Sequence, residues 1–185
     1  MLTSNIKFKN FKIAKKKNKK NFFKKKWFNE IKLLESLKYN YIYSYSKKNL
    51  EKLKRKKNFT LVGMGGSVLG AEAIYQFLKF KIKKKFTFID NLNSVIKKNK
   101  FINNDVNIII SKSGNTLETI LNSNLLLSKK KNNIIITENR DNYLNKLAKN
   151  IKTEIFEHKN YIGGRYSVLS EVGMLPAEIM GLNEK

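Results

Sequence analysis

Val106-Asn-Ile-Ile-Ile-Ser-Lys-Ser-Gly-Asn-Thr-Leu117 is the stretch that decides the fold class of this chain. It opens with an apolar run of the length of one strand, passes through a polar turn, and then places Leu117, Ile120, Leu121 and Leu125 at helical spacing. A run that is apolar at nearly every position is typical of a strand buried on both faces. Strand, tight turn and helix in direct succession therefore predict a parallel sheet covered by helices.

Similar patterns lie before and after this stretch. A glycine turn at Gly63–Ser67 separates an apolar run from a helical pattern through Ala73 and Phe77. The predicted strands are 59–62, 86–89, 106–110, 133–136 and 154–156, and further helical patterns cover 143–148 and 168–179. We therefore expect an open, doubly wound α/β fold with a mainly parallel sheet of about five strands.

The N-terminal part, residues 1–58, has a different composition, which is low in glycine and rich in lysine. Trp27, Ile31 and Leu34 recur at helical spacing, and a dense basic run, Lys15–Lys26, precedes them. We expect a basic N-terminal helical arm over 1–58 and the α/β domain over 59–185.

The composition excludes several classes of protein. The chain has 185 residues and no cysteine, which excludes disulfide frameworks and thiol catalysis. Its single histidine, His158, argues against a histidine-rich metal site. No apolar run approaches the ~20 residues that span a bilayer, and the first residues carry no signal-peptide core, so we expect a cytoplasmic protein with no membrane partner.

The charge balance favours anionic partners in general. Lysine and arginine total 39 against 14 aspartates and glutamates, a formal net charge of +25. Such an excess attracts polyanions, because each neutralised phosphate releases counterions. Only Arg55, Arg140 and Arg165 are arginines, however, and lysine, asparagine and isoleucine share A/T-rich codons, so nucleotide bias also accounts for lysines at solvated positions. We expect non-specific polyanion binding and keep a nucleic-acid-binding function as an alternative.

Gly63-Met-Gly-Gly-Ser67 is the first of three loops whose residue types suit ligand binding or catalysis. Its glycines let the backbone approach a ligand closely, and Ser67 supplies a helix cap or a hydroxyl contact. The alternative is a turn that only tightens a strand-to-helix connection. A dinucleotide fingerprint needs a third glycine where Val68 stands, although Asp90, which ends the next predicted strand, would suit a ribose. No Gly-Lys-Ser/Thr follows, so the loop is not a P-loop.

Ser111-Lys-Ser-Gly-Asn-Thr116 is the second loop and the more specific one. Three hydroxyls, a lysine and a glycine within six residues suit a single phosphate monoester. A polar helix cap, formed by Thr116 with Thr119 or by Ser113 with Thr116, is the alternative.

Gly163-Gly-Arg-Tyr-Ser167 is the third loop, and it carries one of the three arginines between a glycine pair and a helix start. An arginine retained in a lysine-rich chain suggests a need for its fixed charge and planar fork. The alternative is an arginine that stacks on Tyr166 or pairs with Glu171.

Taken together, the three loops resemble those of sugar isomerase (SIS) domain proteins, and most closely those of the first part of the glucose-6-phosphate isomerase family. Ser111-x-Ser-Gly-x-Thr-x-Glu118 resembles the general sugar-phosphate loop of SIS domains, while Gly63–Gly70 and Gly163–Ser170 resemble loops of the isomerases themselves. The resemblance covers roughly residues 59–182 and implies a flavodoxin-like SIS domain.

This resemblance implies roles for particular residues. Arg165 would be catalytic, stabilising a cis-enediolate as a proton moves between C1 and C2 of glucose 6-phosphate and fructose 6-phosphate. The implied substrate-binding residues are Gly66, Ser67, Ser111, Lys112 through its amide, Ser113, Thr116 and Gly164. No metal or organic cofactor is implied. Asn115 departs from the threonine expected at that place.

The resemblance also implies parts that do not match any residue here. In the family, the proton-transferring glutamate, the histidine linked to ring opening and a C-terminal lysine lie beyond the position of Lys185, in a second SIS domain and tail. We therefore assign no general base, and we expect this chain alone to be inactive and an intact enzyme to be more than twice as long and homodimeric. The surroundings of His158 do not match the family's histidine motif, so we expect it to be hydrogen-bonded or exposed to solvent.

Three other functions stay open at this point. A non-catalytic SIS module that senses a phosphosugar would keep the Ser111 loop without needing Arg165. A nucleic-acid-binding protein would depend on Lys15–Lys26 and on low salt. A nucleotide-dependent dehydrogenase lacks the third glycine.

Overall fold

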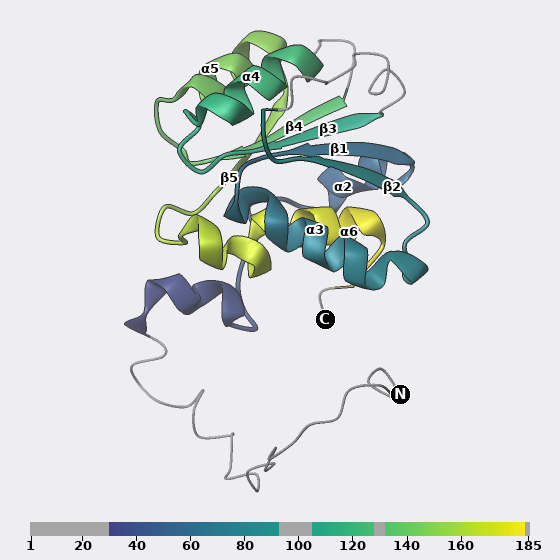
Figure 1. Ribbon diagram of the computed structural model, residues 1–185. Helices are drawn as coiled ribbons and strands as arrows, with labels where there is room; N and C mark the ends of the chain where they lie inside the picture. Colours follow the sequence, from purple (N-terminus) through teal and green to yellow (C-terminus); the bar gives the residue numbers. More distant parts are fainter. Residues whose placement is uncertain (1–29, 93–104, 128–131, 184–185) are drawn as a thin grey trace, which may run out of the picture. The chain divides into compact units, whose positions relative to one another are not determined.

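The computed structural model describes residues 30–92, 105–127 and 132–183 (Figure 1). The described residues from Lys32 onward belong to one compact unit. The basic run Lys15–Lys26 and the predicted helical position of Trp27 lie outside the described residues.

Within the described residues, five strands form one sheet in which all neighbours are parallel, in the order β2-β1-β3-β4-β5. The strands are β1 (Asn58–Val62), β2 (Lys85–Ile89), β3 (Val106–Ile110), β4 (Asn132–Thr137) and β5 (Glu154–Glu157). Each contains the strand expected from the apolar runs. The doubly wound α/β prediction is confirmed, and the strand order is that of flavodoxin-like folds.

Helices cover both faces of this sheet. Figure 1 shows α4 and α5 on one face and α2, α3 and α6 on the other. The helices are α2 (Lys47–Lys54), α3 (Gly66–Leu78), α4 (Leu117–Leu126), α5 (Tyr143–Ile151) and α6 (Glu171–Met180), and the 3₁₀ helices are η2 (Lys32–Leu37), η3 (Lys79–Lys81) and η5 (Gly164–Leu169). In the part of the chain that the structure describes, no helix combines the length and apolar character needed to cross a membrane.

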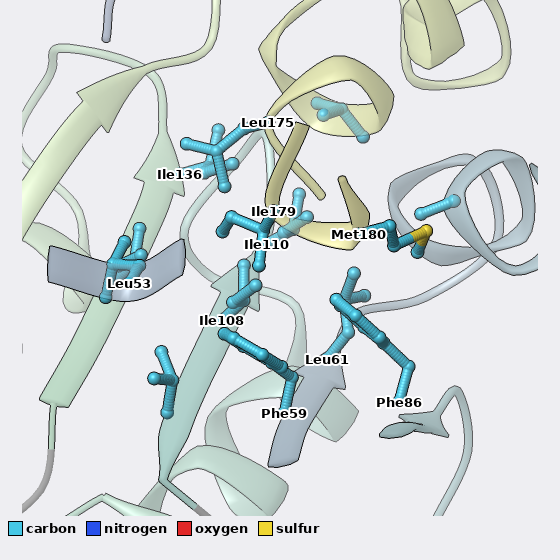
Figure 2. Close-up of a cluster of buried hydrophobic side chains, with 14 of the residues drawn as sticks. Leu53, Phe59, Leu61, Phe86, Ile108, Ile110, Ile136, Leu175, Ile179 and Met180 are labelled. Atoms are coloured by element: carbon cyan, nitrogen blue, oxygen red, sulfur yellow. The ribbon is translucent and has the colours of Figure 1, made fainter. Parts of the chain in front are cut away.

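The two cores follow from the alternation of side chains along each strand. Ile108 and Ile110 of β3 face the core that contains α3 and α6, whereas Ile109 faces the core that contains α4 and α5. Figure 2 shows the larger core, where Leu175 and Ile179 of α6 lie over the sheet. Burial on both faces explains why β3 is apolar at all but one position.

Two helical predictions differ from the structure at their ends. The pattern through Ile31 and Leu34 predicted a helix, and the described part is the 3₁₀ helix η2, whose flanking Ile31 and final Leu37 are 39% and 46% exposed. The last predicted helix included Val168, which instead lies in η5, because Ser170 is extended and separates η5 from α6.

α2 lies within the predicted helical arm 1–58, but its packing into the core was not anticipated, because half of its residues are lysines and its apolar residues are few. It nevertheless inserts Leu50 and Leu53 into the larger core, and Tyr45 just before it is also buried there. Residues before 58 thus contribute directly to the packing of the sheet.

Candidate functional site

The candidate site lies at the carboxyl ends of β1 and β3. These neighbouring strands are continued in opposite directions across the sheet, by β2 on one side and β4 on the other, which makes their carboxyl ends the topological switch point. The Gly63–Ser67 loop follows β1 and the Ser111–Thr116 loop follows β3. A Cβ added at Gly63 would lie 3.0 Å from the carbonyl oxygen of Ile110, so the two loops start side by side.

The hydroxyls of the second loop converge on one another. Ser111 Oγ lies 3.0 Å from Thr116 Oγ1, and Ser113 Oγ lies 3.4 Å from the same atom. Thr116 is the N-cap residue of α4, yet its side chain makes no capping hydrogen bond to the first turn. Thr119 Oγ1 is buried and has no partner among the described residues. The Thr116–Thr119 cap is therefore not formed, whereas Ser113 Oγ contacts Thr116 and accepts from the Asn115 amide at 3.2 Å. The three hydroxyls gather at a helix N-terminus where an anion is favoured.

The backbone of this loop is held from the side of α5. Gly114 has a φ of +68°, and a Cβ there would lie 2.2 Å from the side-chain amide of Asn142. Asn142 is the N-cap of α5 and accepts a hydrogen bond from the Asn145 amide at 2.9 Å. Asn115, the departure from the family pattern, accepts a hydrogen bond from the Tyr143 amide at 2.9 Å. The departure thus ties the loop to α5.

The first and third loops touch through two glycines. A Cβ added at Gly66 would lie 2.2 Å from the carbonyl oxygen of Gly164 and 2.8 Å from the Arg165 amide nitrogen. Ser167 Oγ donates to the Gly164 carbonyl at 2.6 Å. Only glycine at position 66 allows this approach, so the start of α3 carries the third loop to the switch point. Ser67 follows in α3 and is buried.

Arg165 has an exposed side chain in η5. Among the described residues, its guanidinium has no hydrogen-bond or ion-pair partner. The alternative pairing with Glu171 is not formed, because Glu171 is fully buried and accepts hydrogen bonds from Tyr41 and Ser44. The Arg165 cation is thus available to a ligand. Among the described residues, no hydrogen bond joins Arg165 to the hydroxyls of Ser111, Ser113 or Thr116.

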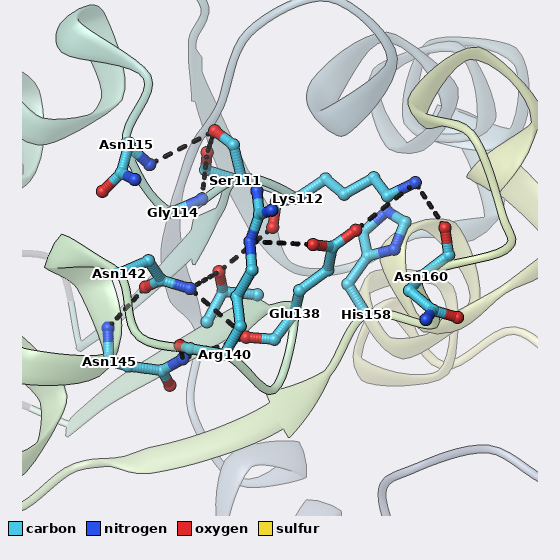
Figure 3. Close-up of polar contacts among 12 residues, drawn as sticks. Ser111, Lys112, Gly114, Asn115, Glu138, Arg140, Asn142, Asn145, His158 and Asn160 are labelled. Atoms are coloured by element: carbon cyan, nitrogen blue, oxygen red, sulfur yellow. Dashed lines mark hydrogen bonds and ion pairs between the residues drawn. The ribbon is translucent and has the colours of Figure 1, made fainter.

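The Lys112 side chain leads away from Ser111 and toward Asn160 (Figure 3). Its ammonium donates to the carbonyl oxygen of Asn160 at 2.7 Å and lies 3.4 Å from Glu138 Oε1. Glu138 Oε2 pairs with Arg140 Nε at 2.9 Å. Glu138 and Asn160 carry no motif in the sequence, and the fact that each follows a strand end was the one signal that could have singled them out.

His158 is hydrogen-bonded through one ring nitrogen, the first of the two expected environments, and it is buried rather than exposed. It is 1% exposed, Nδ1 faces the carbonyl oxygen of Lys159 at 3.1 Å, and Nε2 is buried with no partner among the described residues. Burial lowers the pKa of the imidazole, and the nearby Lys112 cation adds to this effect. The ring is placed there because the His158 backbone amide donates to the Thr137 carbonyl at the end of β4.

Two cavities lie elsewhere and do not include the loop hydroxyls. One of about 410 Å³ is lined by α2 and the amino ends of β4 and β5, and one of about 540 Å³ lies beside α5. Three of the ten residues lining the first are lysines, which is close to the share expected in a chain about one-fifth lysine, so its charge indicates no particular ligand. No group of three or more His, Cys, Asp or Glu suited to a metal occurs among the residues described.

Comparisons with known proteins agree with this geometry. The sequence model of the family described as phosphoglucose isomerase matches residues 44–184. Glucose-6-phosphate isomerase of Methanocaldococcus jannaschii is 34% identical over 149 residues, which cover 73% of this chain and 36% of the relative. The chain thus spans about a third of the length of such curated relatives.

Solved structures share the fold at lower identity. A hypothetical protein from Thermus thermophilus aligns with a TM-score of 0.62 and 24% identity, over 74% of this chain and 37% of that one. The sugar isomerase domain of an RpiR transcription factor from Sphaerobacter thermophilus aligns with a TM-score of 0.56 and 16% identity, over 83% of this chain and 86% of that one.

The strand order and the matching solved structures show that the chain has the doubly wound α/β fold of a sugar isomerase domain. Within that class, the chain belongs to the phosphoglucose isomerase family, because the family model covers most of its length.

Proposed function

We propose that this chain is the sugar-phosphate-binding part of a glucose-6-phosphate isomerase. The observation that carries the proposal is the convergence of Ser111, Ser113 and Thr116 at the first turn of α4, where hydroxyl donors and free helix amides suit one phosphate group. The relatives named glucose-6-phosphate isomerase support the choice of substrate. The 6-phosphate of glucose 6-phosphate or fructose 6-phosphate would sit on this loop, with Gly66, Ser67 and Gly164 bordering the sugar.

Arg165 would supply the fixed cation of the reaction. Removal of the C2 proton from the open-chain sugar phosphate leaves a cis-enediolate, and delivery of a proton to C1 completes the isomerisation. A guanidinium beside the developing oxyanion stabilises this transition state more than the ground state. The unpaired, exposed side chain of Arg165 supports this role. We assign no general base to this chain.

A thermal-shift titration of the 185-residue chain tests the proposal. Fructose 6-phosphate should raise the unfolding midpoint by about 5–10 °C at a hundredfold excess over Kd, because it binds only the folded state. Inorganic phosphate and NAD at matched ionic strength serve as ligand controls. Ser111→Ala should abolish most of the shift, whereas Ser46→Ala, an exposed serine of the α2 cap, should keep it.

Two results would oppose the proposal. Equal shifts with phosphate and with the sugar phosphate would reduce the site to a general anion site. If the chain unfolds cooperatively and no ligand changes its unfolding midpoint, the chain has the fold but does not bind the proposed sugar phosphate.

A phosphosugar-sensing module is the second candidate. It is favoured by the RpiR sugar isomerase domain, 86% of which this chain covers, since that domain is part of a transcription factor. A sensor has no need of the Arg165 cation. Fructose 6-phosphate binding that Arg165→Ala leaves unchanged, together with no isomerisation by the wild-type chain within a longer family protein, would favour this candidate.

A further inference from the structure

Lys112 lies within the loop Ser111–Thr116, which is proposed to bind the phosphate and is called the phosphate loop below. Its side chain, however, makes a contact outside this loop. From the loop it extends to the carbonyl oxygen of Asn160, 48 residues along the chain, at 2.7 Å. Asn160 lies in the short turn that leads into Gly163, Gly164 and Arg165. The Lys112 side chain therefore joins the loop proposed for the phosphate to the segment that carries the proposed catalytic cation.

The contact is held in place by its surroundings. Glu138 Oε1 forms an ion pair with the Lys112 ammonium at 3.4 Å, and Glu138 Oε2 pairs with Arg140 Nε at 2.9 Å. The backbone of Lys112 is fixed by the same strand end, because its carbonyl oxygen accepts from the Glu138 amide at 3.1 Å and from Thr137 Oγ1 at 3.4 Å. Both ends of the residue are thus anchored, which distinguishes Lys112 from a solvated surface lysine.

The buried histidine limits how the cluster can change. His158 lies close enough for the Lys112 and Glu138 charges to influence its pKa, and its Nε2 has no partner in the described part of the chain. A neutral imidazole tolerates the neighbouring ammonium, whereas a charged one would repel it. The lowered His158 pKa therefore favours the neutral ring beside the Lys112 ammonium.

We propose that Lys112 is a positioning residue, whose side chain couples the phosphate loop to the Arg165 segment through the carbonyl of Asn160. The inference rests on the proposed function in that it assigns the ligand's phosphate to one loop and its oxyanion to Arg165. It differs from direct recognition, because the ammonium contacts Asn160 and Glu138 and the side chain leads away from Ser111 (Figure 3).

Two ligands separate positioning from direct contact. Inorganic phosphate probes the loop alone, and 5-phosphoarabinonate adds a carboxylate that imitates the enediolate oxygens and would need Arg165. Calorimetric titration of the full chain should show that Lys112→Met weakens the arabinonate about tenfold, as expected for loss of one charged hydrogen bond, and phosphate less than about twofold. Lys112→Arg should restore most of the affinity. Lys85→Met removes an exposed charge at the start of β2 and controls for the general loss of positive charge.

The double variant makes the coupling explicit. In an Arg165→Ala background, Lys112→Met should cause no further loss of arabinonate affinity, because the two residues act in one chain of contacts. Equal weakening of both ligands by Lys112→Met would assign the side chain to the phosphate itself and overturn the proposal. Unchanged affinity for both ligands would overturn it as well.

Hydrogen exchange tests the inference without any ligand. Lys112→Met should speed amide exchange over residues 160–166, including the Tyr166 amide that donates to Gly163, and leave β3 unchanged. If the wild-type chain binds neither ligand, the proposed function fails while this measurement still decides the contact. Exchange over 160–166 equal to that of wild type would overturn the positioning role.

Discussion

Glu171 has the most unusual environment among the acidic residues that the structure describes. It is fully buried in the first turn of α6, where both carboxylate oxygens accept from Tyr41 Oη at 3.0 Å and Oε1 accepts from the Ser44 amide at 3.0 Å. Burial raises the pKa of the carboxyl, and the hydrogen bonds only partly oppose this. The segment before α2 is thereby attached to the helix that follows η5.

Glu171→Gln should make the chain more stable at neutral pH. Because the folded pKa lies above the ordinary value of 4.5, the folded state holds the proton more tightly than the unfolded chain. Stability from this group is present at low pH and is lost as pH rises from about that ordinary value through the raised folded pKa. Glutamine keeps an acceptor for Tyr41 without the charge.

The difference in unfolding midpoint between Glu171→Gln and wild type, measured across pH, checks this prediction. It should grow as pH rises through that window and then level off. Asp105, whose pKa is lowered first by the Lys57 amide, acts in the opposite direction in both proteins and cancels in the difference. A difference that is constant with pH would contradict the assignment.

Gly66 and Gly164 make an asymmetric pair at the site. Gly66→Ala should destabilise the chain by about 1–3 kcal/mol, because its Cβ would meet the Gly164 backbone at 2.2 Å and backbone atoms move only with the loop. Gly164→Ala is the matched control, since a Cβ there has open space. Chemical denaturation of both variants provides the comparison, and similar losses in the two would show that the close approach is not the cause.

At the scale of elements, α5 is joined to the phosphate loop through its cap. Asn142 accepts from the Asn145 amide and donates to Thr137 Oγ1 and to the Glu138 carbonyl, each at 3.3 Å, in a buried position. Asn142→Ala should cost about 1–2 kcal/mol and should also loosen Gly114, which packs on this side chain.

The exposed cap of α2 offers a comparison. Ser46 accepts from the Asn49 amide at 3.3 Å in a solvent-exposed position, so Ser46→Ala should cost less than Asn142→Ala. Urea unfolding gives the stabilities, and hydrogen exchange at Gly114 and Leu144 gives the effect on the loop. Equal costs for the two caps would argue against the additional role of Asn142.

At the scale of the whole molecule, the net charge of +25 should weaken the fold through self-repulsion. Added NaCl should therefore raise the unfolding midpoint by several degrees as the Debye length falls from ~30 Å at 0.01 M to ~3 Å at 1 M. Sucrose at equal osmolality controls for solvent exclusion. A midpoint that falls with salt would show that favourable ion pairs outweigh the repulsion.

The sequence predicted the sheet well because β1, β3 and β4 are buried on both faces, which makes their apolar runs continuous. It predicted the position of the Ser111 loop for the same reason, since the loop directly follows such a strand. It predicted a helical arm over 1–58 but not the packing of α2, because half of the α2 residues are lysines and only two leucines enter the core. It left open whether His158 is buried, because strand pairing and not local sequence buries that ring.

The sequence by itself determined the parallel α/β class, the three loops and the arginine that stands in the third, because these depend on neighbouring residues and on periodicity. Only the tertiary structure decided which groups meet: Gly66 with Gly164, Lys112 with Asn160, and Tyr41 with Glu171, 130 residues apart. The physical reason is that such contacts are set by strand order and helix packing, which bring together positions whose local sequences carry no sign of each other.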